Sequence, residues 1–224
     1  MDIEIEKIIR SRRKTIALQI TERATLIIRA PYNLRKKTIW DIVSKHEKWI
    51  EKKRRETEER NRKIQPRRFM DGEEFLYLGK PYPLKIVNDG TPQLKFDGGF
   101  FLSQNARDVA REVFETWYKK TAREIIPERV TLLSGKEELS YNRVRITNAR
   151  KRWGSCSSKG NLNFSWRLIM APPAVIDYVI IHELVHLVER NHSARFWNKV
   201  GSLMPDFETH KRWLKENGHL VCFP

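Results

Sequence analysis

Two histidines separated by three residues form the pattern with the clearest chemical meaning in this sequence. His182, Glu183 and His186 make an H-E-x-x-H arrangement. Residues four apart in a helix lie about 40° apart around its axis, so both imidazoles project from one face and can converge on one metal ion. Glu183 points about 100° away from His182, where it can accept a proton from a water molecule without being a ligand. The spacing therefore predicts a hydrolytic metal centre.

A catalytic zinc site needs a third protein ligand and keeps one coordination position open. His192 follows His186 by six residues, too far for the same face of a continuous helix. Asn tolerates the left-handed conformation that ends helices, so we expect the chain to turn at Asn191 and to return His192 to the metal. The sequence thus predicts one Zn²⁺ per chain, bound by His182, His186 and His192. Imidazole nitrogens in an open tetrahedral site suit zinc, although iron, cobalt, nickel or manganese can occupy such a site.

Residues 104–224 are predicted to contain this centre as a catalytic part. A helix is expected from about Asn105 to Leu133, which Pro127 would kink or split. Strands are predicted at Arg143–Thr147, Trp153–Ser157 and Leu162–Leu168, and a buried helix at Ala174–Glu189. Two histidines and a glutamate in so apolar a helix would be costly to bury without partners, which favours metal binding. Ser193 can cap a further helix, whose aromatic residues would brace His192.

Residues 1–103 are predicted to form a basic, β-rich N-terminal part. Strands are expected at residues 3–5, 15–20 and 25–30. From about 34 to 62, apolar residues recur at the spacing of a long amphipathic helix. Glycines and prolines then separate short strands between 69 and 102. The first domain boundary is therefore placed near Ser103.

The charge of the chain is strongly positive. The 224 residues include 44 Lys and Arg against 28 Asp and Glu, which gives a net charge of +16. Residues 1–70 hold 21 basic and 10 acidic residues, so positive charge is densest there. Such a field attracts phosphates, and the basic N-terminal part is a candidate surface for nucleic acid or nucleotides.

Other classes of protein are not favoured. No stretch approaches the roughly 20 apolar residues that span a bilayer, so no membrane segment is expected. Residues 1–4 lack the features of a secretory signal, and a cytoplasmic location is predicted. Cys156 and Cys222 lie far apart without CxxC spacing, which suits reduced thiols better than a disulfide. The sequence specifies no oligomeric state.

Several motifs together resemble one known family. They are Arg152-Trp153-Gly154-Ser155-Cys156-Ser157, Pro172-Pro173, Asp177-Tyr178-Val179, His182-Glu183-Leu184-Val185-His186, Asn191-His192-Ser193, Phe196-Trp197 and Met204-Pro205. This combination resembles the YgjP-like metallopeptidases, which are related to the SprT-like and Wss1-like zinc proteases. Arg10–Thr15, Arg29–Pro31 and Trp49-Ile50 extend the resemblance into the N-terminal part.

The resemblance implies an α+β, zincin-like catalytic part, in which the H-E-x-x-H helix packs against a small, mostly antiparallel sheet. It implies that His182, His186 and His192 bind zinc and that Glu183 is the general base. The expected function is hydrolysis of peptide bonds in a protein or peptide substrate by metal-activated water.

Substrate contacts are less sharply indicated. Arg152, Arg150 and Tyr178 are candidates for an additional electrophile, although Tyr178 also fits a packing role. The Trp153–Phe164 hairpin could bind an extended peptide by strand addition, or Trp153 and Gly154 could only pack the sheet on the helix. Cys156 fits a buried structural thiol better than a thiol that blocks the metal.

Two other functions stay open. The same metal site could hydrolyse a phosphoanhydride, as in a nucleoside triphosphate pyrophosphatase or phosphohydrolase, but no Gly-rich phosphate loop accompanies it. A protein associated with nucleic acid through its basic N-terminal part is the third hypothesis.

Overall fold

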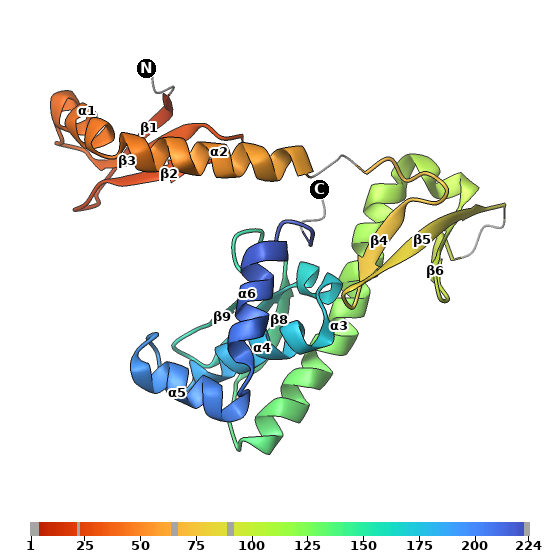
Figure 1. Cartoon of the computed structure of the whole chain (residues 1–224). Coiled ribbons are helices and arrows are strands. Elements are labelled where there is room, and N and C mark those ends of the chain that lie inside the picture. The colour runs from red at the N-terminus through yellow and green to blue at the C-terminus, as the bar shows by residue number, and fades with distance from the viewer. Residues whose placement is uncertain (1–4, 22, 64–66, 89–91, 222–224) are drawn as a thin grey trace. The chain divides into compact units, whose positions relative to one another are not determined.

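The chain divides into two compact units, residues 1–66 and residues 67–224. The computed structural model describes residues 5–21, 23–63, 67–88 and 92–221 (Figure 1). Among these, none of the helices combines the length and apolar composition needed to cross a membrane. Cys222, and with it the pairing state of the two cysteines, lies outside the described residues, as do residues 3 and 4 of the first predicted strand.

The first unit is a three-stranded sheet with two helices. Its strands are β1 (Ile5–Ser11), β2 (Ala17–Ile20) and β3 (Leu26–Pro31), and its helices are α1 (Lys36–Lys45) and α2 (Glu47–Lys63). The central strand β3 is parallel to β1 and antiparallel to β2. Alternate residues of β3 pack against the helices in a small core of Leu26, Ile28, Ala30, Ile39, Val43 and Ile50. The single helix predicted over 34–62 is two helices, because α1 ends at His46, where the ring Nδ1 lies 2.8 Å from the Ile42 carbonyl oxygen.

The second unit begins with a four-stranded sheet and a long helix. The strands are β4 (Glu74–Tyr77), β5 (Lys80–Val87), β6 (Leu94–Phe96) and β7 (Phe100–Ser103), in the order β4-β5-β7-β6. A short helix η1 (Gln104–Val109) leads into α3 (Ala110–Lys136), which continues through Pro127 without the expected break (Figure 1). Phe75 stacks on Phe114 of α3 with ring centroids 4.2 Å apart, and Phe100 lies 5.1 Å from the same ring.

The boundary predicted near Ser103 is therefore wrong, because residues 67–103 share a core with α3. The turn between β4 and β5 also contacts the segment that precedes the H-E-x-x-H helix. The backbone N–H of Leu78 donates to the Ile169 carbonyl at 3.0 Å, and that of Gly79 to the Met170 carbonyl at 3.1 Å. This sheet is consequently part of the unit that holds the H-E-x-x-H motif.

The rest of the second unit carries that motif. It contains β8 (Arg143–Thr147), β9 (Gly154–Cys156), β10 (Asn161–Ser165), η2 (Trp166–Met170), α4 (Pro173–Val185), α5 (Ala194–Leu203) and α6 (Phe207–Asn217). Strand β10 lies between β8 and β9, parallel to the former and antiparallel to the latter. The α+β class is confirmed, but the sheet is mixed rather than mostly antiparallel, because β10 enters between the two earlier strands.

Helix α4 is held by α3 on one side. A two-pronged ion pair joins the guanidinium of Arg129 on α3 to the carboxylate of Asp177 on α4. The apolar residues of α4 fill the core on several sides, as expected for a helix without a polar stripe. The orientation of α4 is thus fixed by both packing and charge.

A substitution at Gly79 tests the contact between the β4–β5 turn and Pro172. A Cβ at this position would lie 2.6 Å from Cγ and 2.7 Å from Cα of Pro172, and its φ is +79°. We expect Gly79→Ala to cost about 1–3 kcal/mol more than a change that introduces only backbone strain. Gly72→Ala is the matched control, because Gly72 has φ +82° and nothing within 4 Å of an added Cβ. Thermal unfolding of both variants gives the comparison, and equal losses would show that the Pro172 contact is unimportant.

Candidate metal centre

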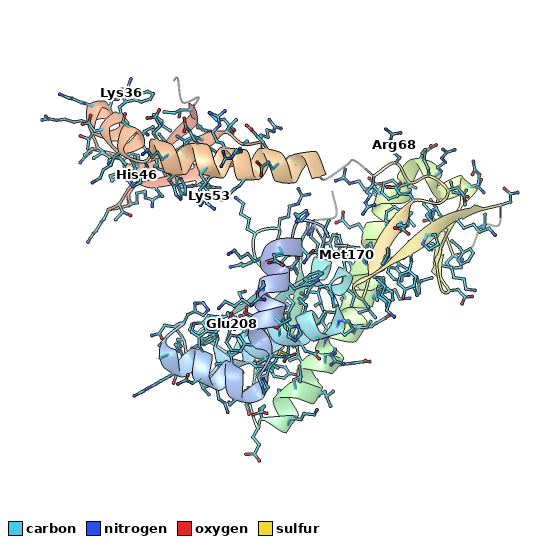
Figure 2. The ribbon with its side chains drawn as sticks, in the orientation of Figure 1. Lys36, His46, Lys53, Arg68, Met170 and Glu208 are labelled. Carbon is cyan, nitrogen blue, oxygen red and sulfur yellow. The ribbon has the colours of Figure 1, made fainter. Side chains whose placement is uncertain are left out.

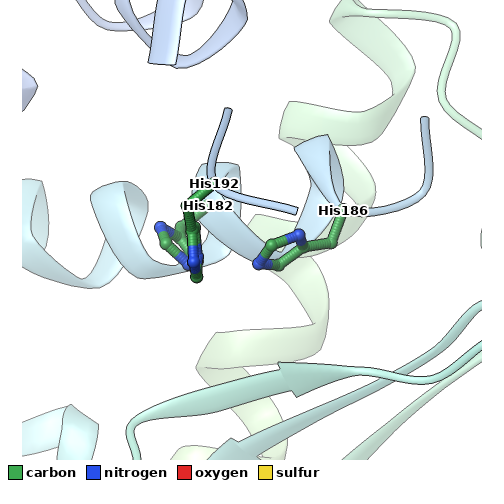
Figure 3. Close-up of side chains that lie close together, drawn as sticks. All are labelled: His182, His186 and His192. Atoms are coloured by element: carbon green, nitrogen blue, oxygen red, sulfur yellow. The ribbon is translucent and has the colours of Figure 1, made fainter. Parts of the chain in front are cut away.

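Three histidine rings meet at the C-terminal end of α4. His182 and His186 come from the helix and its C-cap, and His192 from the segment that follows (Figure 3). One ring nitrogen from each lies within 4.8 Å of the others. The Nε2 atoms of His182 and His192 are 3.0 Å apart. The structure therefore brings together all three predicted ligands.

The chain reaches His192 by a route that differs from the prediction. Helix α4 ends at Val185, four residues before the expected end, and the next turn tightens as the Leu187 N–H donates to Leu184 at 3.0 Å. Asn191 is not among the residues with positive φ. Its side chain instead accepts a hydrogen bond from the Ser193 N–H at 3.2 Å, which makes an Asx turn. The left-handed turn expected at Asn191 is wrong.

The helix after the third histidine fixes the ring positions. The Ser193 hydroxyl caps α5 by accepting from the Phe196 N–H at 3.5 Å. Phe196 is fully buried, and its ring centroid lies 4.9, 4.6 and 4.8 Å from those of His182, His186 and His192. Trp197 stacks on His192 at 5.7 Å. The aromatic residues of α5 thus brace the cluster, as the sequence predicted.

Hydrogen bonding and burial prepare the histidines to act as ligands. His186 Nδ1 lies 3.0 Å from the Glu189 carbonyl oxygen, which leaves Nε2 free to face the other two rings. Burial, together with the neighbouring His186, His192 and Lys211, lowers the pKa of His182 to about 3. The ring of His182 is therefore neutral, the form that donates a lone pair to a metal.

The residues fit a divalent cation. Two Nε2 atoms in direct contact must either share a proton or share a cation, and no carboxylate belongs to the cluster. A set of three imidazoles with room for a fourth ligand suits zinc. His182 Nδ1 is buried without a hydrogen-bond partner among the described residues, so the ring is positioned mainly by packing.

Glu183 lies beside this cluster and is closely packed against β9. Its side chain is buried, and a Cβ added to Gly154 of β9 would lie 2.6 Å from both Cγ and Oε1 of Glu183. Burial raises the pKa of this carboxyl to about 7, although the charge of Arg152 and a hydrogen bond from the Cys156 backbone act in the opposite direction. The absence of a side chain at Gly154 is what admits the carboxylate.

A cleft of about 490 Å³ opens over the cluster. One wall is β9 and the turn after it, and the other is the end of α4 with the segment that follows. Its lining residues are Gly154, Ser155, Cys156, Ser157, Ser158, Gly160, His182, Glu183, His186, Leu187, Arg190 and His192. Ser155, Ser157, Ser158 and Gly160 belong to the Trp153–Phe164 hairpin, which was predicted as a possible substrate wall. Leu187 and Arg190 were not predicted, since nothing in their local sequence shows that β9 faces α4.

The remaining predicted contacts occupy different places. Arg152 is exposed just before β9, and Trp153 is half-buried, with its ring close to Gly218. Tyr178 is 5% exposed and stacks on Phe207 at a centroid distance of 6.5 Å. None of the three belongs to the cleft lining, so of the four predicted substrate contacts only Gly154 lies in the cleft.

The sequence also matches a known family over most of its length. Residues 14–217 match the family described as YgjP-like, metallopeptidase domain. This chain belongs to the YgjP-like family. It is accordingly a metal-dependent peptidase, and the histidine cluster is the place where the described residues can hold the metal.

Two solved structures, both of metallopeptidase zymogens, are similar to part of this YgjP-like chain. Abylysin of Pyrococcus abyssi is 19% identical with a TM-score of 0.38, covering 41% of this chain and 94% of its own. Jannalysin of Methanocaldococcus jannaschii is 21% identical with a TM-score of 0.36, covering 42% of this chain and 96% of its own. A comparison with curated proteins gave no match.

The close contact between Glu183 and Gly154 leads to a prediction for Gly154→Ala. The added methyl group would displace the carboxylate, and a misplacement of about 1 Å in a catalytic group can cost about 100-fold in rate. We expect peptidase activity to fall by that order while metal content stays at the wild-type level. Gly160→Ala is the control in the same cleft. Its φ of +70° adds backbone strain, but its Cβ would meet nothing closer than Leu187 Cδ2 at 3.5 Å, so it leaves the Glu183 carboxylate in place. Unchanged activity in Gly154→Ala would contradict the proposed importance of this contact.

Proposed function

We propose that this YgjP-like peptidase binds one Zn²⁺ through His182, His186 and His192 and uses Glu183 as the general base in peptide hydrolysis. The observation that carries the proposal is the position of Glu183. Its carboxylate is buried next to the three convergent imidazoles and lines the same cleft. A carboxylate adjacent to, but outside, the ligand set is the arrangement that metal-assisted hydrolysis requires.

The roles of the protein groups follow from this arrangement. When bound, zinc supplies Lewis acidity, which makes water more acidic and stabilises negative charge on a carbonyl oxygen. Glu183 accepts the proton of the attacking water and can deliver it to the leaving amine. The raised pKa of Glu183, caused by burial, matches that of a group exchanging protons near neutral pH.

The edge of β9 is evidence in favour of a peptide as the substrate. Strand β9 is hydrogen-bonded to β10 on one side and is an edge strand on the other, where Gly154, Ser155 and Cys156 line the cleft. An extended peptide could add to this edge through main-chain hydrogen bonds, with its carbonyl groups passing the histidine cluster. Because such bonds do not depend on side chains, they favour protein and peptide substrates generally.

The decisive experiment separates the metal from the base. We expect purified protein to hold about one zinc per chain and His192→Ala to lose most of it, because two imidazoles do not complete the site. Glu183→Gln should keep the metal but lose about 10²- to 10⁴-fold in hydrolysis of unfolded protein, the usual contribution of a general base. Elemental analysis and a fluorescent casein assay measure the two quantities.

Matched controls are available in the same unit. His210→Ala removes a histidine that pairs with Asp206 outside the cluster, and Glu128→Gln removes an exposed carboxylate on α3. Both should retain metal and activity. Full hydrolysis by Glu183→Gln would refute the assignment of the base. Hydrolysis of nucleoside triphosphates in place of protein by the wild type would favour the phosphohydrolase alternative.

A second candidate function concerns the first unit, which holds 19 basic and 10 acidic residues, a net charge of +9. Trp40 is 49% exposed and Trp49 is 41% exposed. Lys36 and Lys37 precede Trp40 by one helical turn, and Lys52 and Lys53 follow Trp49 by one turn. Figure 2 shows Lys36 on α1 and Lys53 on α2. Exposed aromatic rings beside cations are the elements with which proteins bind single-stranded nucleic acid, so we propose this as an additional ligand.

Charge reversal tests this binding. We expect the full chain to bind a fluorescent single-stranded oligonucleotide with an affinity that falls steeply with salt. Lys36→Glu with Lys37→Glu should weaken binding at least tenfold. Lys120→Glu with Lys215→Glu makes the same change in net charge at exposed positions of the second unit and should have a smaller effect. Equal losses in both double variants would indicate only a response to total charge.

A further inference from the structure

The cleft contains a cationic side chain that the proposed hydrolysis does not use. Arg190 lines the cleft together with the histidines and Glu183. Its side chain is exposed, and among the described residues no carboxylate lies within ion-pair distance of it. A guanidinium that faces the cleft without a carboxylate partner is available to bind an anion.

The position of Arg190 is set by the wall opposite the metal ligands. Its Nη2 lies 3.4 Å from the carbonyl oxygen of Ser158, in the turn after β9. The positive charge also reaches β9, because Arg190 acts to lower the pKa of the Cys156 thiol while burial and Glu183 raise it. Arg190 thus spans from the segment after α4 to the far end of the β9 wall.

The two charged groups of the cleft occupy different ends of this wall. Glu183 contacts Gly154 at the start of β9, whereas Arg190 contacts Ser158. Ser158 lies four positions after Gly154 and begins the turn. The extended part of this span, from Gly154 to Ser157, corresponds to about 10 Å. A peptide added to the edge of β9 with its reacting carbonyl near Glu183 would therefore have a residue about three positions away beside Arg190.

We propose that Arg190 gives this peptidase a preference for substrates with a carboxylate about three residues from the scissile bond. The inference rests on the proposed peptide hydrolysis. A carboxylate close to the scissile bond would be repelled by Glu183, whereas one near Ser158 would meet the guanidinium. The carboxylate can belong to an aspartate or glutamate side chain or to the C-terminus of the substrate, since both present the same group to Arg190.

Peptide series distinguish these two sources. The wild-type cleavage site in a neutral fluorogenic peptide is first located by mass spectrometry. Glu, Gln or Lys is then placed three residues before or after that bond, each with a free or an amidated C-terminus. We expect kcat/KM to favour Glu over Gln by about two- to fivefold at low salt, mainly through KM, and the preference to shrink as salt rises. A preference for the free over the amidated terminus would identify the C-terminal carboxylate.

Variants at Arg190 decide whether this residue is the cause. Arg190→Ala should remove the preference for Glu, and Arg190→Glu should shift it toward Lys, both with wild-type metal content. Arg195→Ala is the matched control, an exposed arginine on α5 outside the cleft lining. Retention of the Glu preference in Arg190→Ala would overturn the proposal.

Binding measurements keep this test independent of turnover. Anisotropy of the labelled peptides with metal-loaded Glu183→Gln, alone and combined with Arg190→Ala, reports the same preference without hydrolysis. Peptides that bind with an Arg190-dependent preference but are never cleaved by the wild type would refute the proposed function and leave the role of Arg190 intact. If Glu and Gln peptides bound equally to the Glu183→Gln protein, the role of Arg190 would be refuted, whereas the proposed peptide hydrolysis would not be affected.

Discussion

The close approach of Glu183 to Gly154 is the contact on which the candidate site depends. The carboxylate can occupy the space beside β9 only because position 154 has no side chain, since a Cβ there would overlap it. The same approach brings the edge of β9 to the end of α4, so one contact positions both the proposed base and the proposed substrate wall. The cleft exists because helix and strand meet at this distance.

Contacts with other parts of the second unit hold α4 in place. Arg129 and Asp177 join α3 to α4, and the β4–β5 turn is hydrogen-bonded to the η2 segment that precedes α4. These contacts explain why residues 67–103 belong to the second unit. A sheet that the sequence assigns to another domain supports the start of α4, while Phe196 and Trp197 pack on the histidines at its end and beyond it.

The sequence was most informative where local periodicity and chemistry coincide. The spacing of His182 and His186 on one helical face required no knowledge of the tertiary structure, and the need for a third ligand pointed to His192. The turn at Asn191 was predicted wrongly, because the side chain of Asn can stabilise a turn by accepting a hydrogen bond as well as by adopting a left-handed backbone.

Long-range packing accounts for the other differences. The boundary near Ser103 followed a change from turn-rich to helical sequence, but Phe75 and Phe100 complete their burial only on α3. The position of β10 between β8 and β9 is likewise set by tertiary packing, and the residue pattern of a strand does not predict its neighbours in the sheet. The sequence did not indicate a role for Arg190, because an arginine after a helix is usually exposed to solvent. Only the folded structure shows that it lines the cleft opposite β9.

Burial shifts the pKa of His182 in the cluster and that of Glu183 beside it in opposite directions, and both shifts favour the uncharged form. It lowers the pKa of His182 and raises that of Glu183, because an apolar environment penalises an imidazolium and a carboxylate alike. Neutral imidazoles are what a cation requires as ligands, and a cation held there would in turn favour the carboxylate form of Glu183. The apolar surroundings therefore keep His182 in the form that binds a metal, and they make the charge of Glu183 depend on whether a metal is bound. This coupling explains physically why an H-E-x-x-H motif belongs in a buried helix, where the same burial without a metal would only be a cost.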